Sequence, residues 1–366
     1  MTVRVNKPEF NIREKLTELE RPIGLKGSEL MRAETTQEAR DLVSAGRKNL
    51  IINGRFDFWQ RGTSFTGGQY TADRWQQALS GGTATVSRQA FTLGQTEVPG
   101  NPVYYLRKSC SVGNSNCGIN QPIEDVRTGA GGPVTVSFWA KGTNPPGYGY
   151  WAMQVWQRFG TGGSPSSHVQ NNKELKVTSN WKKYTFTYEL ASISGKTLGN
   201  NDDSKLDLII RQHVSDNNTG AWELNIANVQ VELGRNATDF EHRSYGEELA
   251  LCQRYYWQIT QDGGSNAVYI APSVGYGSGN YNLVAIANPV EMRVPVNSVT
   301  TSGTAGDYQF WGGNTVVDLD AVPYLRVSNS KHQTSLDCTK NVASGETRMF
   351  RIKSSTSAYI GFSAEL

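Results

Sequence analysis

The chain has 366 residues, enough for two or three domains that each bury a core of their own. Only 19% of the residues are charged, glycine occurs 38 times and aromatic residues reach 10%, which is typical of many short strands joined by tight turns. The net charge of +3 comes without a run of basic residues, so nucleic acid is not an expected partner. No segment approaches about eighteen uninterrupted apolar residues, so we expect neither membrane insertion nor a secretory signal.

Residues 1–48 predict a helical arm with a hinge. The segment "PEFNIREKLTELERP" begins with Pro8 and ends at Pro22, and a second helix is indicated by "TTQEARDLVSAGRKN". The apolar residues of the first helix recur at helical spacing and form one stripe: Ile12, Leu16, Leu19 and Ile23. We expect this stripe to pack against copies of itself or against a larger body, since so short a helix is marginal alone. The alternative is a local helix that folds back on the rest of the chain.

From Asn49 the pattern changes to the period of two that is typical of β-strands. In "PVTVSFWAKG" the apolar residues Val134, Val136, Phe138 and Ala140 alternate with polar ones, and "WAMQVWQRF", "KKYTFTYEL" and "KLDLIIRQH" behave in the same way. In "WELNIANVQVEL" the apolar residues change face part-way, which predicts a β-bulge near Ala227. The pattern predicts a jelly-roll β-sandwich over residues 49–240.

Residues 241–366 predict a second antiparallel β domain that opens with a helix. The helix is expected over Gly246 to Tyr256, with Leu249, Cys252 and Tyr256 on one face and acidic residues in its first turn. Strand-like segments follow up to the last residues, so the final strand is expected to be part of a sheet. The whole chain is therefore predicted to be mainly β.

Several motifs of this sequence resemble bacteriophage tail-fibre proteins. They are "NLIINGRFDFWQRGTSF", "YTADRWQ", "VTVSFWAKG", "WKKYTFTYEL", "VQVELGRNATDFEHRSYGEELALCQRYYW" and the final "IGFSAEL". The predicted head is similar to jelly-roll carbohydrate-binding modules. The resemblance covers Asn49 to about Trp257 and the last few residues.

This resemblance implies a virion protein, a tail fibre that binds host-surface glycan through its β-sandwich head during adsorption. It also implies a homotrimer, attachment to other virion proteins of the tail or portal region through residues 1–48, and assembly in the host bacterial cytoplasm. The alternative is a capsid decoration protein or head fibre with a purely structural role. The four cysteines are expected as free buried thiols, although Cys110 and Cys117 could face one another across a hairpin.

Sugar recognition by a sandwich needs aromatic rings that stack on pyranose faces, flanked by hydrogen-bonding side chains. Strand alternation places one set of such residues on the polar sides of their strands, and they could line one surface if those strands are neighbours. These candidates are Tyr105, Arg107, Trp139, Gln154, Trp156, Arg158, Arg211 and His213. The alternative is that a loop, the first strand or a sister chain covers Trp139 and Trp156. The tryptophans at 59, 75, 181 and 222 are expected in the core.

Neither a metal nor a cofactor is expected. Carbohydrate-binding modules of this shape often hold a structural calcium, but Arg55 follows the Asn53-Gly54 pair, and its charge disfavours a cation there. No pair of cysteine or histidine residues has metal-ligand spacing. We expect no catalytic residues, because the Asp202-Asp203 pair lies in a turn and no internal repeat of the kind found in depolymerising tailspikes occurs.

Overall fold

The computed structural model describes residues 48–366, apart from gaps at 80, 113–116, 169–171, 213–218, 262–265, 277–280, 327–328, 341, 343–344 and 355–357. The predicted helical arm, with Ile12, Leu16, Leu19 and Ile23, lies outside the described residues. The described part is mainly antiparallel β-structure, which confirms the predicted fold class. None of its helices has the length and apolar character needed to span a bilayer.

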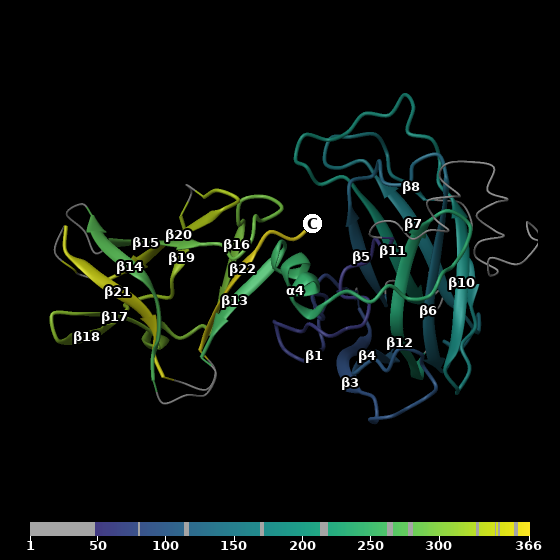
Figure 1. Cartoon of the computed structure of the whole chain (residues 1–366), viewed down its shortest axis with the longest axis horizontal. Helices are drawn as coiled ribbons and strands as arrows, with labels where there is room; N and C mark the ends of the chain where they lie inside the picture. Colours follow the sequence, from purple (N-terminus) through teal and green to yellow (C-terminus); the bar gives the residue numbers. More distant parts are fainter. Residues whose placement is uncertain are drawn as a thin grey trace, which may run out of the picture.

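The first sandwich begins with a sheet of six antiparallel strands (Figure 1). Their order in space is β1-β3-β4-β12-β6-β10, so β12 from late in the chain separates β4 from β6. The strands are β1 (Ser64–Phe65), β3 (Thr83–Ala90), β4 (Tyr104–Val112), β6 (Pro133–Gly142), β10 (Lys182–Glu189) and β12 (Thr219–Leu233).

The second sheet of this sandwich has the order β2-β5-β11-β7-β8, with β9 also paired to β7. The strands are β2 (Gln76–Ala78), β5 (Gly118–Glu124), β7 (Trp151–Arg158), β8 (Ser167–His168), β9 (Lys173–Leu175) and β11 (Lys205–Gln212). Non-sequential neighbours in both sheets are what a jelly roll requires.

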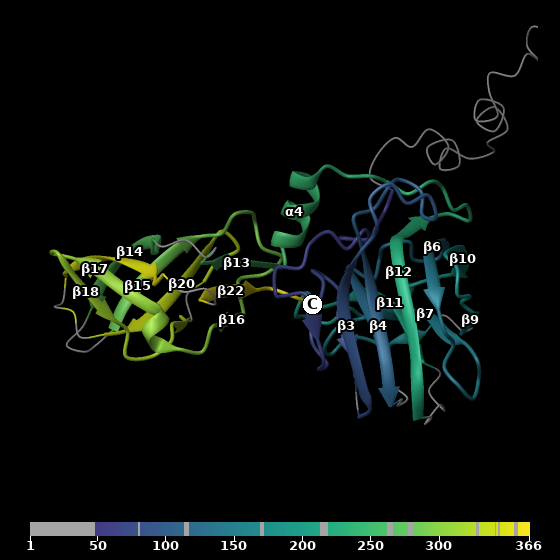
Figure 2. The same cartoon turned by 90° about the horizontal axis from the view of Figure 1, so that it is seen from below.

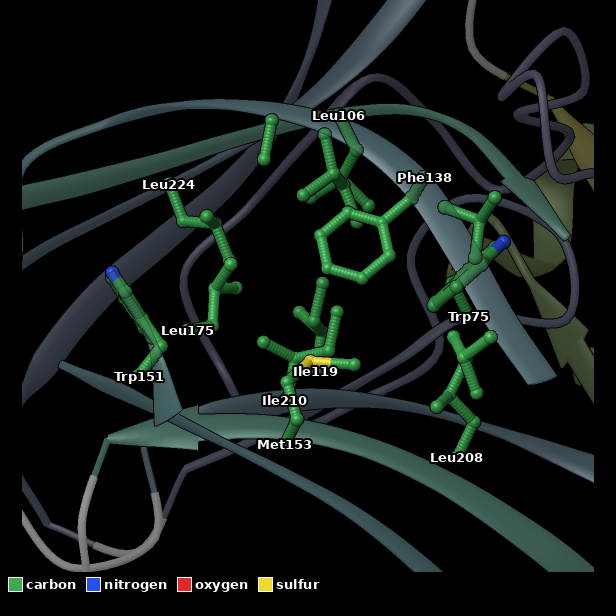
Figure 3. Close-up of a cluster of buried hydrophobic side chains, with 14 of the residues drawn as sticks. Trp75, Leu106, Ile119, Phe138, Trp151, Met153, Leu175, Leu208, Ile210 and Leu224 are labelled. Atoms are coloured by element: carbon green, nitrogen blue, oxygen red, sulfur yellow. The ribbon is translucent and has the colours of Figure 1, made fainter. Parts of the chain in front are cut away.

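The core of the first sandwich fills the space between the two sheets. Figure 3 shows Phe138 and Leu106 from one sheet facing Met153 and Ile210 from the other. The alternation predicted for β6 is confirmed, because its four apolar positions are fully buried in this core. The tryptophans at 59, 75 and 222 also belong to this core, as predicted.

Strand β12 contains the predicted bulge. Its pairing with β6 shifts register between Ala227 and Gln230, and Asn228 between them has a φ of 51°. The bulge lets Ile226 and Val229 both reach the core although they are three residues apart. Gly54 packs directly on it, since a Cβ there would lie 2.2 Å from the carbonyl oxygen of Val229.

The C-terminal β unit opens with helix α4 (Tyr245–Gln253), which Ser244 caps by accepting a hydrogen bond from the backbone N–H of Glu247. The predicted helix is too long at its end. Tyr256 is the first residue of β13 (Tyr256–Thr260), which pairs with the last strand, so long-range pairing ends the helix. Of the predicted helix face, Cys252 is buried and Leu249 is half-buried in α4, whereas Tyr256 is buried as part of β13.

The rest of this unit is a three-stranded sheet, β13-β22-β16, and a seven-stranded sheet, β18-β17-β21-β14-β15-β20-β19, which share one apolar core. The last strand is the centre of the smaller sheet, as expected for a final strand that is part of a sheet. A short 3-10 helix, η1 (Ala305–Asp307), precedes β17. The strands are β14 (Val268–Tyr276), β15 (Tyr281–Ala287), β16 (Ser298–Thr301), β17 (Tyr308–Gly312), β18 (Thr315–Asp318), β19 (Tyr324–Leu325), β20 (Gln333–Thr339), β21 (Thr347–Ile352) and β22 (Tyr359–Ser363).

The two β units meet in a polar joint. Figures 1 and 2 show α4 and the end of the chain between them. The buried Arg74 of the first sandwich forms an ion pair with Glu365, and the ring of Tyr255 lies 3.5 Å from its guanidinium carbon. Glu124 accepts hydrogen bonds from Arg254 at 2.9 Å and from Tyr255 at 2.8 Å.

All four cysteines are free and buried, as predicted. The sulfur atoms of Cys110 and Cys117 lie 2.7 Å apart, so the two thiols also face one another as the alternative expected.

Candidate functional site

The predicted glycan contacts do not share one surface. Those on β4 and β6 project from the outer face of their sheet, which we name the Trp139 face: Tyr105, Arg107 and Trp139. Those on β7 and β11 project from the outer face of the opposite sheet, which we name the Trp156 face: Gln154, Trp156, Arg158 and Arg211. His213 lies outside the described residues. The expectation of a single surface is wrong because β4 and β6 belong to one sheet and β7 and β11 to the other.

On the Trp139 face an aromatic cluster closes the surface. The ring centroid of Tyr105 lies 4.8 Å from that of Phe91 and 5.3 Å from that of Trp181, and Trp139 packs against the same cluster. Tyr105 is only 9% exposed, so its ring is not an exposed platform, contrary to the expectation. Trp181 was predicted in the sandwich core; it is buried, but in this outer cluster.

The remaining sequence candidate on the Trp139 face is held by its polar neighbours. Arg107 donates a hydrogen bond to the Asn225 side chain at 3.0 Å and forms an ion pair with Glu223 at 3.3 Å. Its hydrogen-bonding capacity is therefore largely used within the sheet.

The Trp156 face is built from cross-strand neighbours on β5, β11 and β7. One rung places Asp207 of β11 beside Trp156 of β7, and the next places Ile209 between Asn120 and Gln154. A third rung pairs Arg211 with Gly118, where a Cβ would lie 2.5 Å from the Cβ of Arg211. Glycine at 118 therefore lets the two strands approach beneath the arginine.

A hydrogen-bonded frame fixes the indole of Trp156. Its Nε1 donates to Oε1 of Gln154 at 3.1 Å, and the guanidinium carbon of Arg158 lies 4.9 Å from its ring centroid. Arg158 in turn donates to the buried Asp207 at 2.6 Å. The half-buried ring thus has a defined orientation on a strand of the sheet.

Arg211 brings an unused donor to the same face. Its Nε is buried and has no hydrogen-bond partner among the described residues. Burial lowers the pKa of Arg211, and the positive charge of Arg158 lowers it further. The residue as a whole is only partly buried, so its guanidinium adds a positively charged hydrogen-bond donor to this face.

Two residues of the Trp156 face were not among the sequence candidates. Asp207 orients Arg158, and Asn120 donates to Asp207 at 3.5 Å. Alternation within "GINQPIE" does place Asn120 opposite Ile119 and Ile123, so the signal for an outward side chain was present. The pairing of β5 with β11 could not be predicted from the local sequence pattern.

The arrangement on the Trp156 face suits binding. One aromatic ring is surrounded by fixed amide, carboxylate and guanidinium groups, the set that recognises hydroxyl-bearing rings. Among the described residues, no group of three or more histidine, cysteine, aspartate or glutamate side chains is placed to hold a metal ion.

No protein family profile and no curated protein matches the chain. Among solved structures, a Bacteroides thetaiotaomicron protein provisionally assigned as sugar-binding aligns at 15% identity and a TM-score of 0.34, covering 51% of this chain and 100% of that one. The CBM22-1 xylan-binding domain of Paenibacillus barcinonensis Xyn10C aligns at 13% identity and a TM-score of 0.30, covering 53% and 100%. The enzymatically active domain of tailspike protein 4 of bacteriophage CBA120 aligns at 16% identity and a TM-score of 0.30, covering 51% and 21%.

Proposed function

We propose that the protein binds glycan through the Trp156 face. The observation that carries this proposal is the frame around Trp156, in which Gln154 and Arg158 fix the ring and Asp207 fixes Arg158. A ring held in this way loses little conformational freedom when a sugar stacks on it. The guanidinium of the partly buried Arg211 on the same sheet supports the proposal, because guanidinium groups donate hydrogen bonds to sugar hydroxyls.

We further propose that the chain is a virion protein, a phage tail fibre that contacts host-surface polysaccharide during adsorption. This rests on the resemblance of the motifs between Asn49 and Trp257. In this proposal residues 1–48 attach the chain to other virion proteins, residues 49–240 bind glycan and residues 241–366 form a supporting domain. Weak single sites become effective when several heads are tethered on one particle.

We also propose a homotrimer. Large apolar side chains exposed within strands of the seven-stranded sheet support association, and they include Tyr269 and Trp311. Size-exclusion chromatography with multi-angle light scattering of the full chain tests this, and a monomer at micromolar concentration would overturn it.

The glycan proposal is tested by two matched tryptophan variants. Trp156→Ala and Trp139→Ala remove half-buried indoles from opposite faces of the same sandwich. Binding of the purified full chain to an array of bacterial surface polysaccharides is expected to weaken about tenfold in Trp156→Ala and to persist in Trp139→Ala. The reverse pattern would move the site to the Trp139 face, and no binding by the parent chain would overturn glycan recognition.

The second candidate function is a capsid decoration protein or head fibre that binds no sugar. Electron microscopy of particles labelled with an antibody to this chain distinguishes the two, since the tail-fibre proposal requires label on the tail. Label on the capsid shell would favour the alternative. Deletion of residues 1–48 is expected to leave a soluble head that no longer incorporates into particles.

A further inference from the structure

A pocket of about 290 Å³ lies where the first sandwich meets the segment leading into α4. Three stretches far apart in the sequence line it: residues 49–58, the start of β4 near Tyr104, and residues 240–248. We name it the junction pocket. It is separate from the Trp156 face, because none of its lining residues belongs to β5, β7 or β11.

Aromatic side chains form much of its wall. Tyr245, the first residue of α4, is 71% exposed, and its ring centroid lies 4.8 Å from that of the buried Phe58. On the β4 side, the guanidinium carbon of Arg88 lies 4.5 Å from the ring centroid of Tyr104. Exposed tyrosines that rest on a second aromatic group are suited to stacking against a ligand ring.

Polar groups with unused hydrogen-bonding capacity line the same pocket. Among the described residues, no hydrogen bond reaches the carboxylate of Asp57, whose nearest ion-pair contact is Nε of Arg55 at 3.6 Å. That Nε is buried and has no hydrogen-bond partner of its own. Burial raises the pKa of Asp57, while the charges of Arg55 and His242 oppose the rise. The Asp57 carboxylate is 28% exposed beside the Arg55 guanidinium, so it has hydrogen-bonding capacity that a polar ligand could use.

The other charged side chains of the pocket, apart from His242, form ion pairs with one another. Arg243 forms ion pairs with Glu241 at 3.3 Å and Glu248 at 3.2 Å, and it donates to the carbonyl oxygen of Ile51 at 3.0 Å. This buried network fixes the pocket's walls. The lining holds two arginines against three carboxylates, which disfavours an anionic ligand.

We propose that the junction pocket binds a single uncharged sugar ring. Tyr245 would stack on the ring, and Asp57 and Arg55 would bond to its hydroxyl groups. The volume lies at the lower limit of about 300 Å³ for small-molecule sites, which suits one sugar ring better than a chain of them. The inference goes beyond glycan binding by the Trp156 face and does not depend on it.

The test measures binding of methyl glycosides of glucose, galactose, mannose and N-acetylglucosamine to the full chain by ligand-observed NMR. The parent protein is expected to bind at least one of them in the millimolar range. Tyr245→Ala and Asp57→Ala are each expected to weaken that binding about tenfold. Asp57→Ala should fold normally, because it removes a partly buried charge that has no hydrogen bond.

Two controls separate this site from the rest of the molecule. Tyr281→Ala removes another exposed tyrosine, 46% exposed and next to Tyr276, and should leave binding unchanged. The effects of Tyr245→Ala and Asp57→Ala are also measured in the Trp156→Ala background, so that sugar bound by the Trp156 face does not contribute. Methyl glucuronide should bind at least about tenfold more weakly than methyl glucoside because of the carboxylates.

Three outcomes would overturn the proposal. They are absence of binding for all four glycosides, binding that survives both Tyr245→Ala and Asp57→Ala, and binding that Trp156→Ala abolishes. The last would assign the sugar to the Trp156 face. If Trp156→Ala leaves binding to the polysaccharide array unchanged, the proposal for the Trp156 face is wrong, but the proposal for the junction pocket still stands. The two proposals can therefore fail separately.

Discussion

The two β units differ in where they leave large apolar side chains exposed. In the first sandwich such residues lie in loops or at strand ends: Leu93, Val103, Val112, Tyr148 and Leu233. In the C-terminal β unit, apart from Tyr245 at the start of α4, they lie within or at the ends of strands of the seven-stranded sheet: Tyr269, Val274, Tyr281, Trp311, Val316 and Tyr324. The outer faces of the first sandwich carry polar side chains and an aromatic cluster, and such surfaces suit a hydroxyl-rich ligand. The seven-stranded sheet of the C-terminal β unit exposes apolar side chains, and such a surface suits contact with protein.

The largest effect is expected from a substitution that breaks the joint between the two units. Arg74→Ala removes a fully buried partner of Glu365, and breaking a buried ion pair typically costs about 3–5 kcal/mol. We expect the free energy of unfolding in urea to fall by about that amount, and the two units to unfold in separate transitions. Arg235→Ala, which breaks an exposed pair with Glu189, is the control and should change little. A single unshifted transition in Arg74→Ala would show that the joint does not couple the units.

The free energy of unfolding is expected to change with pH by about 3 kcal/mol because of one carboxyl group at the same joint, since a pKa shift of two units corresponds to roughly that energy. Burial raises the pKa of Asp73 to about 6, and Arg61 and the bonds from Gln60 only partly oppose this. The folded protein holds this proton more tightly than the unfolded chain. The stability that protonated Asp73 contributes is therefore complete below the pKa that this group has in the unfolded chain. It is lost as the pH rises through 6.

Asp73→Asn removes this titration. The difference in unfolding free energy between variant and parent, measured from pH 3 to pH 7.5, should shift in favour of the variant as the pH rises. A difference that stays constant across this range would contradict the raised pKa. Gln60 also donates to the carbonyl oxygen of Tyr256, so the effect reports on contact between the two units.

The smallest expected effect compares one tryptophan from each outer surface. Trp181 is 8% exposed within the aromatic cluster, whereas Trp311 is 41% exposed and contacts Tyr269 edge-on at 5.7 Å. Trp181→Ala should cost about 2 kcal/mol more than Trp311→Ala, because only the first creates a cavity. Thermal unfolding at low protein concentration measures this. Equal costs would mean that the seven-stranded sheet is covered in solution.

Local patterns predicted the faces of individual strands well. The alternation in β6 and the bulge in β12 follow from side-chain period, which depends only on neighbouring residues. The division of the predicted site between two faces does not. It arises because β4 and β6 belong to the same sheet as β12, whereas β7 pairs with β11 in the opposite sheet, and these long-range pairings are not visible in the local pattern. Tyr105 is buried for a similar reason, since its cover comes from Phe91 and the distant Trp181.

Two further features depended on long-range contacts. The helical period continued into Tyr256, but pairing with β22 turns this residue into a strand. The junction pocket combines Asp57, Tyr104 and Tyr245 from three separate stretches. The charged pair in "NGRFD" and the polar run in "FEHRSYG" were visible in the sequence, but nothing local showed that they meet.

The anchorage of Asn49 has a mechanical consequence. The backbone N–H of Leu50 donates to the carbonyl oxygen of Val231 at 2.8 Å, and the Asn49 side chain accepts from Val231 at 3.1 Å. Arg243, beside α4, donates to the carbonyl oxygens of Asn49 and Ile51. Tension applied through residue 48 therefore enters the middle of a sheet and, through one arginine, the unit beyond it. The force is therefore distributed over hydrogen bonds in both units instead of acting on the hydrogen bonds of a single edge strand.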